Sequence, residues 1–176
     1  MLRMTALVDQ AKAATGLSDF GEDGWQEGLE RLIVSAESEA RLNASGEAIF
    51  DGQAIMRLMR RLEIEDWYTR HPEIDDEEIA APLMVLGLPR TGSTALHCLL
   101  GEDPAVRTMS NWEAMAPCPP PELATYDTDP RIAQMEAQMA MRDVMTPRMK
   151  QMLPSTATSP SEDQLTMGYS FVSQIF

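Results

Sequence analysis

The sequence of 176 residues predicts an α/β fold in which most of the chain is helical. Two observations predict it. The first 80 residues carry apolar side chains at the three- and four-residue spacing of helices, whereas residues 82–88 form a continuous apolar run bounded by proline on both sides. A run of this kind is typical of a strand buried on both faces of a parallel sheet. We therefore divide the chain into a helical segment, residues 1–80, and an α/β segment, residues 81–176.

Two helices are predicted in the helical segment. Asp23 is the expected N-cap of the first, and the second runs from about Ala48 to Leu62. The first helix has one apolar face made of Trp25, Leu29, Leu32, Ile33, Ala36 and Ala40. Three arginines of the second, Arg57, Arg60 and Arg61, are expected on its solvated face, with a ligand site as the less favoured alternative. His71-Pro72 ends this region, because a residue before proline avoids the helical conformation.

Further helices are predicted after the apolar run. They are a helix over Ala95–Leu100 closed by Gly101, a helical turn over Asn111–Met115, a helix entered at Asp129-Pro130 that continues to about Met145, and a helix started by the capping-box spacing of Ser161–Gln164. The candidate core positions of the third are Ile132, Met135, Met139 and Val144. Residues 169–176 are expected to continue the last helix or to form a strand.

Composition and charge exclude several classes of protein. Lys and Arg total 14 against 28 Asp and Glu, so the net charge is −14, which disfavours binding to nucleic acid. No apolar stretch approaches the roughly 20 residues that span a bilayer, and the N-terminus lacks the apolar core of a signal peptide. Two cysteines make no disulfide framework, and no Cys/His cluster has the spacing of a metal site. We therefore expect a cytoplasmic protein that binds no metal.

The segment from Gly87 to Thr94 carries the chemistry. It has the glycine spacing of a phosphate-binding P-loop, with Ser93 in place of the usual Lys. Gly92 allows a tight turn, so that the N–H groups of Gly92, Ser93 and Thr94 can converge on a tetrahedral anion. Arg90 adds a permanent positive charge. A P-loop kinase or NTPase would require Lys at position 93 and a strand ending in Asp for magnesium, and neither is found.

The run Leu86–His97 resembles the 5′-phosphosulfate-binding loop of sulfotransferases, in the Pro-Arg-x-Gly-Ser/Thr-Thr form found in bacterial members. Further segments that resemble the bacterial group are Thr15–Gly21, Glu39–Leu42, Arg70–Ile74, Asp103-Pro104, Trp112-Glu113 and Asp129–Ala133. The resemblance covers roughly residues 15–176 and implies a P-loop-like sulfotransferase fold with a parallel sheet. It also implies 3′-phosphoadenosine 5′-phosphosulfate (PAPS) as donor, without a metal. The donor-binding residues that it implies are Pro89, Arg90, Thr91, Gly92, Ser93 and Thr94.

The resemblance also implies catalytic roles. Arg90 would stabilise negative charge on the sulfate and the bridging oxygen. Glu113, which lies 21 residues after Gly92, is a candidate for the base that receives the acceptor's proton, against a structural or capping role. His97, one helical turn beyond Ser93, is a second candidate, although a histidine in a helix more often serves packing.

The implied activity is transfer of a sulfuryl group from PAPS to a hydroxyl of a small molecule, a lipid or a carbohydrate. Within the sulfotransferase pattern, the segments that hold the donor's 3′-phosphate have no counterpart in this sequence. The predicted sheet is also incomplete, because a parallel strand needs neighbours. We therefore expect the front portion of a larger enzyme. The alternative is a truncated, inactive sulfotransferase-like protein that binds an anion or a partner, and assembly into a homo-oligomer is left open.

Overall fold

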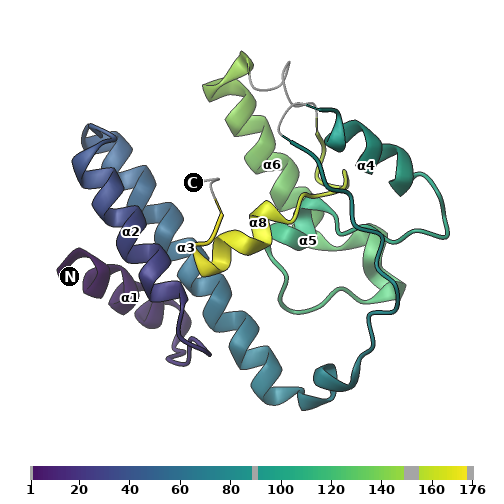
Figure 1. The fold of residues 1–176 in the computed structure, drawn as a ribbon, viewed down its shortest axis with the longest axis horizontal. Coiled ribbons are helices and arrows are strands. Elements are labelled where there is room, and N and C mark those ends of the chain that lie inside the picture. The colour runs from purple at the N-terminus through teal and green to yellow at the C-terminus, as the bar shows by residue number, and fades with distance from the viewer. Residues whose placement is uncertain (1, 89–90, 149–154, 174–176) are drawn as a thin grey trace. The chain divides into compact units, whose positions relative to one another are not determined.

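The computed structural model describes residues 2–88, 91–148 and 155–173, and its regular elements are helices. In chain order these are α1 (Leu2–Thr15), α2 (Trp25–Ser38), α3 (Ala44–Arg70), η1 (Pro72–Asp76), α4 (Ser93–Gly101), α5 (Asn111–Met115), η2 (Leu123–Thr128), α6 (Pro130–Met145), α8 (Gln164–Met167) and η3 (Gly168–Ser170) (Figure 1). The chain divides into two compact units. Unit 1 is Met1–Asp76 with Asp163–Phe176, and unit 2 is Glu77–Glu162.

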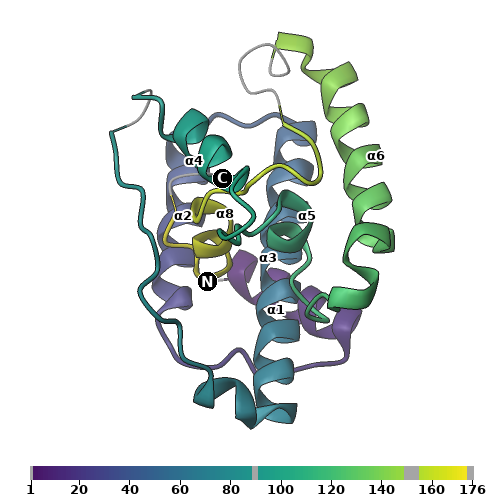
Figure 2. The same ribbon diagram turned by 90° about the vertical axis from the view of Figure 1, so that its right-hand side faces the viewer.

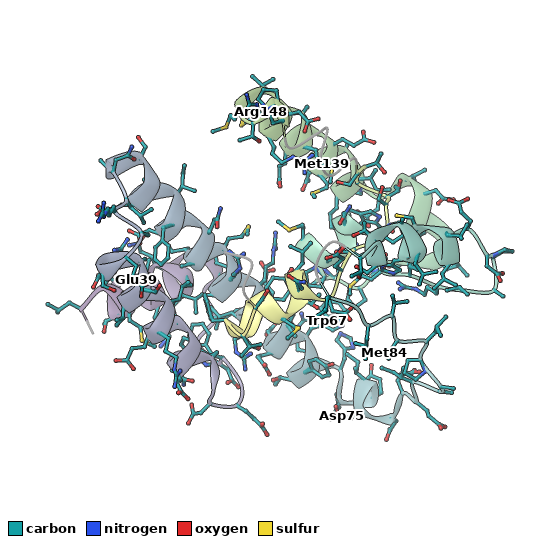
Figure 3. The ribbon with its side chains drawn as sticks, turned by 45° about the horizontal axis from the view of Figure 1, so that its top comes forward. Glu39, Trp67, Asp75, Met84, Met139 and Arg148 are labelled. Atoms are coloured by element: carbon teal, nitrogen blue, oxygen red, sulfur yellow. The ribbon has the colours of Figure 1, made fainter. Side chains whose placement is uncertain are left out.

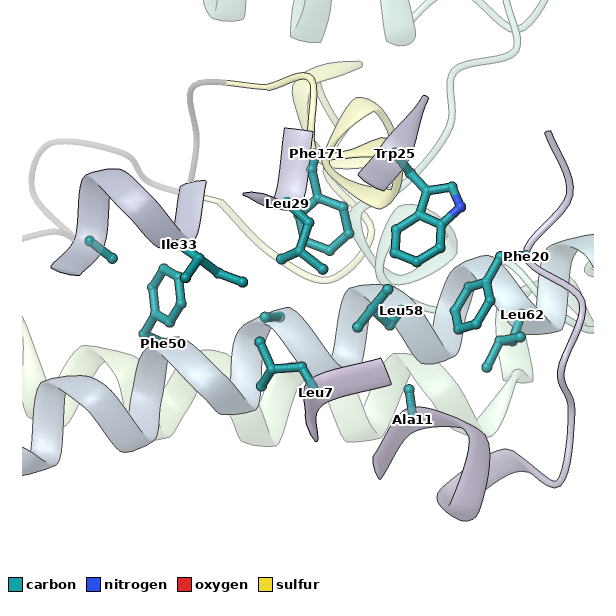
Figure 4. Close-up of a cluster of buried hydrophobic side chains, with 12 residues drawn as sticks. Leu7, Ala11, Phe20, Trp25, Leu29, Ile33, Phe50, Leu58, Leu62 and Phe171 are labelled. Carbon is teal, nitrogen blue, oxygen red and sulfur yellow. The ribbon is translucent and has the colours of Figure 1, made fainter. Parts of the chain in front are cut away.

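Unit 1 is held together by a hydrophobic cluster that α1, α2 and α3 share with the C-terminal segment. Figure 4 shows α3 beneath the aromatic rings of Phe20, Trp25 and Phe171, with Leu7 and Ala11 of α1 packed against it. The remaining buried members of the cluster are Leu29, Ile33, Ala36, Phe50, Ala54, Leu58 and Leu62. Burying such side chains contributes about 1.5–3 kcal/mol for each large one, which makes this cluster the main source of stability in unit 1.

The helices of unit 1 confirm the predicted apolar face and correct its boundaries. Trp25, Leu29, Ile33 and Ala36 are buried along α2, as the spacing predicts, whereas Ala40 lies beyond the end of the helix. Gly24 rather than Asp23 occupies the N-cap, and the Asp23 carboxylate accepts a hydrogen bond from Gln26 Nε2 at 2.6 Å. α3 is longer than predicted. Asn43 caps its start by accepting from the Gly46 N–H at 2.8 Å, and its last residue precedes His71-Pro72 as predicted.

Arg57, Arg60 and Arg61 do not form a solvated face of α3, so that prediction was wrong. Arg57 is buried, and burial lowers the pKa of its guanidinium. The Arg61 side chain is only 13% exposed and donates hydrogen bonds to the carbonyls of Phe20 (2.6 Å) and Glu22 (3.1 Å) and to Ser170 Oγ (2.9 Å). Its planar fork of donors satisfies loop carbonyls, a role that helical spacing does not reveal.

The predicted strand over residues 82–88 does not form in the described structure. This segment runs as a single trace without helix or strand (Figure 2). Among the residues described, the sole β-type pairing is an isolated antiparallel bridge between Ser110 and Pro160. A strand exists only through backbone hydrogen bonds to a neighbouring strand, and the described part of unit 2 shows no such pairing for this segment.

The helices of unit 2 follow the prediction closely at their starts. α5 has the predicted bounds, and α6 begins with Pro130 directly after Asp129, whose carboxylate accepts from the Arg131 N–H at 2.9 Å. Met139 is buried on α6, but Val144, a predicted core position, is 82% exposed. Unit 2 therefore has well-defined helix starts but little buried apolar surface.

The C-terminal segment agrees with the prediction in part. The Ser161–Gln164 capping box does not form: α8 begins after Asp163, no side chain caps it, and the buried Ser161 hydroxyl has no partner among the described residues. Tyr169 and Ser170 lie in η3 (Gly168–Ser170), which directly follows α8, so of the two predicted alternatives the continued helix agrees with the structure and the strand does not.

Candidate functional site

The loop at the start of α4 is built around Gly92. This residue is the N-cap of α4 and has φ +94°, a left-handed conformation that glycine adopts without the steric cost that other residues meet. Hydrogen bonding in α4 begins with the Leu96 N–H, which donates to the Gly92 carbonyl at 3.0 Å. In the described structure no side chain caps this helix, so its first N–H groups, from Ser93 to Ala95, are available to an external acceptor.

A close contact folds the loop before Gly92. The Thr91 hydroxyl donates to the Leu88 carbonyl at 2.7 Å. A Cβ atom at position 87 would lie 2.9 Å from Thr91 Oγ1, so a side chain at Gly87 would displace the Thr91 hydroxyl. Both glycines of the predicted motif are thus explained by the local geometry.

An acidic side chain lies against this loop. Thr94 Oγ1 donates to Glu162 Oε1 at 2.6 Å, and both residues are exposed. A carboxylate at the start of a helix is favoured by the partial positive charge there. The Glu162 carboxylate therefore contacts the first turn of α4 through the Thr94 hydroxyl.

The structure brings four of the predicted donor-binding residues together. Thr91, Gly92, Ser93 and Thr94 form the turn and the first residues of α4. Pro89 and Arg90 lie outside the described residues. His97 is half-buried on the second turn of α4, and its imidazole has no partner in the described part of the chain.

Glu113 occupies a different environment, at the start of α5. Its Oε2 atom accepts from the Ser110 N–H (2.7 Å) and the Tyr126 hydroxyl (2.7 Å), and its Oε1 atom accepts from Arg107 Nη2. With Ser110 it forms a capping box, and its side chain is only 5% exposed. Both oxygens are therefore engaged by donors in this structure.

Three members of this network, Ser110, Arg107 and Tyr126, were not predicted as a group. Burial, followed by the bond to the Glu113 carboxylate, raises the pKa of the Tyr126 hydroxyl, while its contact with Ser110 acts in the opposite direction. The spacing Ser110-x-x-Glu113 is itself a capping-box signal and could have indicated the cap from sequence. Nothing in the local sequence indicates that Tyr126 joins it.

Arg131 holds the start of α6 against the segment after α5. Its guanidinium pairs with the Asp129 carboxylate at 2.6 Å, donates to the carbonyls of Ala116 (2.8 Å) and Pro119 (2.6 Å), and lies 4.7 Å above the Trp112 ring. The bond to Arg131 lowers the pKa of Asp129. Arg131 is thus engaged in holding the fold of unit 2.

No group of three or more His, Cys, Asp or Glu side chains among the described residues could hold a metal ion. None of the described helices is long and apolar enough to span a membrane.

Comparison with known proteins identifies the family. The sequence profile of the sulfotransferase family matches residues 82–176, which is more than half of the chain and includes the loop at α4. The chain belongs to the sulfotransferase family. The comparison with curated proteins finds no match.

Two solved structures of sulfotransferases are similar to the whole chain. Sulfotransferase STF1 from Mycobacterium tuberculosis is 31% identical with a TM-score of 0.82, and sulfotransferase STF9 from Mycobacterium avium is 32% identical with a TM-score of 0.84. The matches cover 97% and 96% of this chain but only 47% and 44% of those two chains. The chain therefore has the sulfotransferase fold over a length that is less than half of either relative, and the predicted sheet is not seen in the described residues.

Proposed function

We propose that the loop Gly87–Thr94 binds the 5′-phosphosulfate end of PAPS and that the protein takes part in sulfuryl transfer to an acceptor hydroxyl. The observation that carries this proposal is the uncapped start of α4 directly after Gly92, inside the region that matches the sulfotransferase family. Backbone N–H groups that have no acceptor of their own are a ready site for phosphate oxygens. The hydroxyls of Ser93 and Thr94 add two donors at the same place.

The proposed reaction is an in-line displacement at sulfur. The acceptor oxygen forms a bond to the sulfur atom while the bond from sulfur to the bridging oxygen breaks, and adenosine 3′,5′-bisphosphate leaves with the electron pair. The hydroxyl proton passes to a base. The N–H groups of Ser93 and Thr94 would hold the 5′-phosphate, and Arg90 would stabilise the charge that develops on the bridging oxygen. Such a transfer needs no metal ion.

The proposed base is Glu113 or His97, and their surroundings differ. Glu113 would have to release one of its donors to receive a proton, whereas the His97 imidazole has no described partner. Glu113→Gln separates catalysis from capping, because glutamine still accepts the Ser110 N–H but no longer acts as a base. If Glu113 is the base, the rate of sulfuryl transfer falls by about 100-fold or more in Glu113→Gln, whereas His97→Ala keeps most of the wild-type rate. The reverse pattern assigns the role to His97.

Calorimetric titration with adenosine 3′,5′-bisphosphate tests the donor site. We expect the wild type to bind and Arg90→Ala to bind at least about tenfold more weakly, because a hydrogen bond to a charged group contributes roughly 1.5–3 kcal/mol. Arg31→Ala is the matched control, since it removes an exposed arginine of α2 that is paired with Glu27. Equal affinity of the wild type and Arg90→Ala would remove Arg90 from this role, and absence of binding to the wild type would contradict a donor site in this chain.

A second candidate function is binding of the donor or another anion without transfer. It is favoured by the surroundings of Glu113, whose two carboxylate oxygens already accept hydrogen bonds from Ser110, Tyr126 and Arg107. Binding of adenosine 3′,5′-bisphosphate without release of sulfate or transfer from labelled PAPS would support it. For the transferase, the proposed acceptor is the hydroxyl of a small molecule, a lipid or a carbohydrate. A cytoplasmic location is proposed on the basis of the two free cysteines, Cys98 and Cys118.

A further inference from the structure

The two carboxylate oxygens of Glu113 have different surroundings. Oε2 accepts the Ser110 N–H and the Tyr126 hydroxyl, both at 2.7 Å, so its two lone pairs are occupied. Among the described residues, Oε1 is bound by one group, Nη2 of Arg107, whose side chain is 66% exposed. Such a pair exchanges easily, because solvent screens it and the long side chain regains its freedom on leaving. Oε1 is therefore the oxygen that a substrate reaches by displacing a single group.

A chain of hydroxyls fixes the other oxygen. The Tyr126 hydroxyl has one proton and donates it to Glu113 Oε2, so the Ser110 hydroxyl, 3.1 Å away, is the donor to the Tyr126 oxygen. Hydroxyls linked in this way polarise and strengthen one another. Burial raises the pKa of the Tyr126 hydroxyl, so it stays protonated and donating throughout the neutral range. The orientation of the carboxylate is thereby set through Oε2.

Packing alone does not require the Tyr126 hydroxyl. The other residues of η2 are exposed, so the Tyr126 ring supplies the packing of this element. The ring lies against the buried Trp112 ring, with centroids 5.3 Å apart, and a phenylalanine would make the same contact. The cap of α5 does not require the hydroxyl either, because Ser110 and Glu113 satisfy each other's N–H groups without it. The hydroxyl therefore serves the carboxylate rather than the fold.

We propose that Tyr126 is a positioning residue for sulfuryl transfer, whose hydroxyl holds Oε2 of Glu113 so that Oε1 receives the proton of the acceptor hydroxyl. Arg107 leaves Oε1 as the acceptor enters. The acceptor O–H bond breaks, its proton bonds to Oε1, and the acceptor oxygen bonds to sulfur as the bridging oxygen departs with its electron pair. The proton passes from Oε1 to solvent after the product leaves. The inference rests on the proposed function and selects Glu113 over His97, whose imidazole no described residue orients.

Steady-state kinetics of the 176-residue chain test the role of Tyr126. Labelled PAPS is the donor, and benzyl alcohol, hexanol and methyl glucoside are the acceptor probes, one for each proposed class of acceptor. Tyr126→Phe keeps the ring and removes the hydroxyl. We expect kcat to fall by about ten- to hundredfold through loss of orientation, while the KM for PAPS stays within about twofold of the wild-type value. A residue that only stabilises the fold would lower the melting temperature and leave the kcat of the folded protein unchanged.

Tyr68→Phe is the matched control. It removes the hydroxyl of a tyrosine on α3 that is 46% exposed, and its kcat and KM should equal those of the wild type. A double variant shows whether Tyr126 acts through Glu113. Because glutamine does not accept the proton, Glu113→Gln combined with Tyr126→Phe should lose no more rate than Glu113→Gln alone. Additive losses would mean that Tyr126 acts by another route, which contradicts the proposal.

Removal of Arg107 should have the opposite effect. Arg107→Ala frees Oε1, so we expect kcat/KM for the acceptor to rise by about two- to fivefold, the size expected of one exposed ion pair. Arg148→Ala is its matched control, because Arg148 is an exposed arginine of unit 2 that lies beyond the C-terminal end of α6 (Figure 3). Its kinetics should equal those of the wild type. A fall in Arg107→Ala as large as that in Tyr126→Phe would contradict the assignment of Oε1.

The outcomes separate this inference from the proposed function. If the wild type transfers sulfuryl groups but Tyr126→Phe keeps its kcat, or Glu113→Gln keeps the wild-type rate, the inference is wrong and the transferase remains. If the wild type sulfates none of the three probes, the proposed transferase and this inference fail together. Nucleotide binding by the loop at α4 is measured separately by calorimetry and does not depend on either result.

Discussion

Gly92 determines how the chain enters α4. With φ +94°, it turns the backbone so that the helix starts at Ser93 and its first N–H groups remain open. Space is not the constraint, because a Cβ atom at this position would meet nothing within 4 Å. The requirement for glycine is therefore conformational, and it couples the stability of the turn to the ability of the loop to bind an anion.

Gly92→Ala tests this coupling. An alanine forced into the left-handed region costs roughly 1–2 kcal/mol, so the turn should relax and the affinity for adenosine 3′,5′-bisphosphate should fall by about tenfold in calorimetry. Gly52→Ala is the control. It makes the same change at an exposed position of α3, where a Cβ atom meets nothing within 4 Å. This substitution should raise the stability of the protein by roughly 0.5–1 kcal/mol without changing its affinity for the nucleotide. Unchanged affinity in Gly92→Ala would show that the turn is not needed for binding.

Glu162 competes with an incoming anion for the hydroxyl of Thr94. Its carboxylate accepts from Thr94 Oγ1 at 2.6 Å, and it would repel a phosphate at the start of α4. Glu162→Gln should therefore raise the affinity for adenosine 3′,5′-bisphosphate by about two- to fivefold, the size expected of one exposed charge. Glu122→Gln removes an equal charge from another exposed position of unit 2 and should leave the affinity nearly unchanged. An equal rise of affinity in both variants would mean that the affinity depends on the net charge of the protein and not on the position of Glu162.

Asp129 should make unit 2 sensitive to acid. The bond to Arg131 lowers its pKa below the ordinary value of 3.8, so the folded state binds the proton less readily than the unfolded state. The stabilisation by this pair is present above that ordinary value and is lost as the pH falls through the folded-state pKa. Asp129→Asn keeps an N-cap acceptor but loses the charge. The melting temperature measured by thermal unfolding should therefore fall less between about pH 5 and about pH 3 in Asp129→Asn than in the wild type. A parallel decline in the two proteins would contradict this assignment.

At the scale of elements, α3 organises unit 1 through Arg61 in addition to its apolar face. The guanidinium joins the segment before α2, through Phe20 and Glu22, to Ser170 of η3. A single side chain thereby fixes two connections that are distant in sequence.

Arg61→Ala should destabilise the protein by about 2–4 kcal/mol, because it leaves loop carbonyls without their charged donor. Arg31→Ala, which removes an exposed i,i+4 pair on α2, should cost no more than about 0.5 kcal/mol. Chemical denaturation of the two variants measures both values. A loss of stability in Arg61→Ala as small as that in Arg31→Ala would mean that the hydrogen bonds of Arg61 contribute little to the stability of the protein.

The helices were predictable where the signal is local. Asp129-Pro130 starts α6 and His71-Pro72 ends α3, because caps and prolines act within a few residues. The apolar run 82–88 was misread as a formed strand, since pairing depends on neighbours that a local pattern does not contain. The hydrogen bonds of Arg61 and of Tyr126 join residues that belong to different elements of the fold. The spacing of residues within one element therefore does not predict them.

The candidate site was predictable to the same extent. The loop and its two glycines were recognised from their spacing, and the geometry of Gly87 and Gly92 explains why glycine stands there. Glu113 was singled out by its distance from Gly92, but its contacts with Ser110, Arg107 and Tyr126 emerge only from the fold. Spacing identified the residue and the structure identified its surroundings.

At the scale of the whole molecule, apolar burial is distributed unevenly. Unit 1 contains the buried cluster, whereas unit 2 carries the family loop and an exposed apolar segment. A net charge of −14 must be overcome locally wherever a polyanionic donor binds. In unit 2, Arg107 and Arg131 are already paired with Glu113 and Asp129. Under the proposal above, the open N–H groups at the start of α4, together with Arg90, attract the donor locally.

The most direct measurement of the central claim is an NMR titration of the 19.6 kDa protein that follows backbone amides while a nucleotide is added. If the loop holds the 5′-phosphate, adenosine 3′,5′-bisphosphate and adenosine 5′-monophosphate should both shift the amide signals of Gly92, Ser93 and Thr94. Adenosine 3′-monophosphate should not shift them at the same concentration. Shifts confined to other residues, or equal shifts with the 3′- and 5′-monophosphates, would contradict the assignment of this loop.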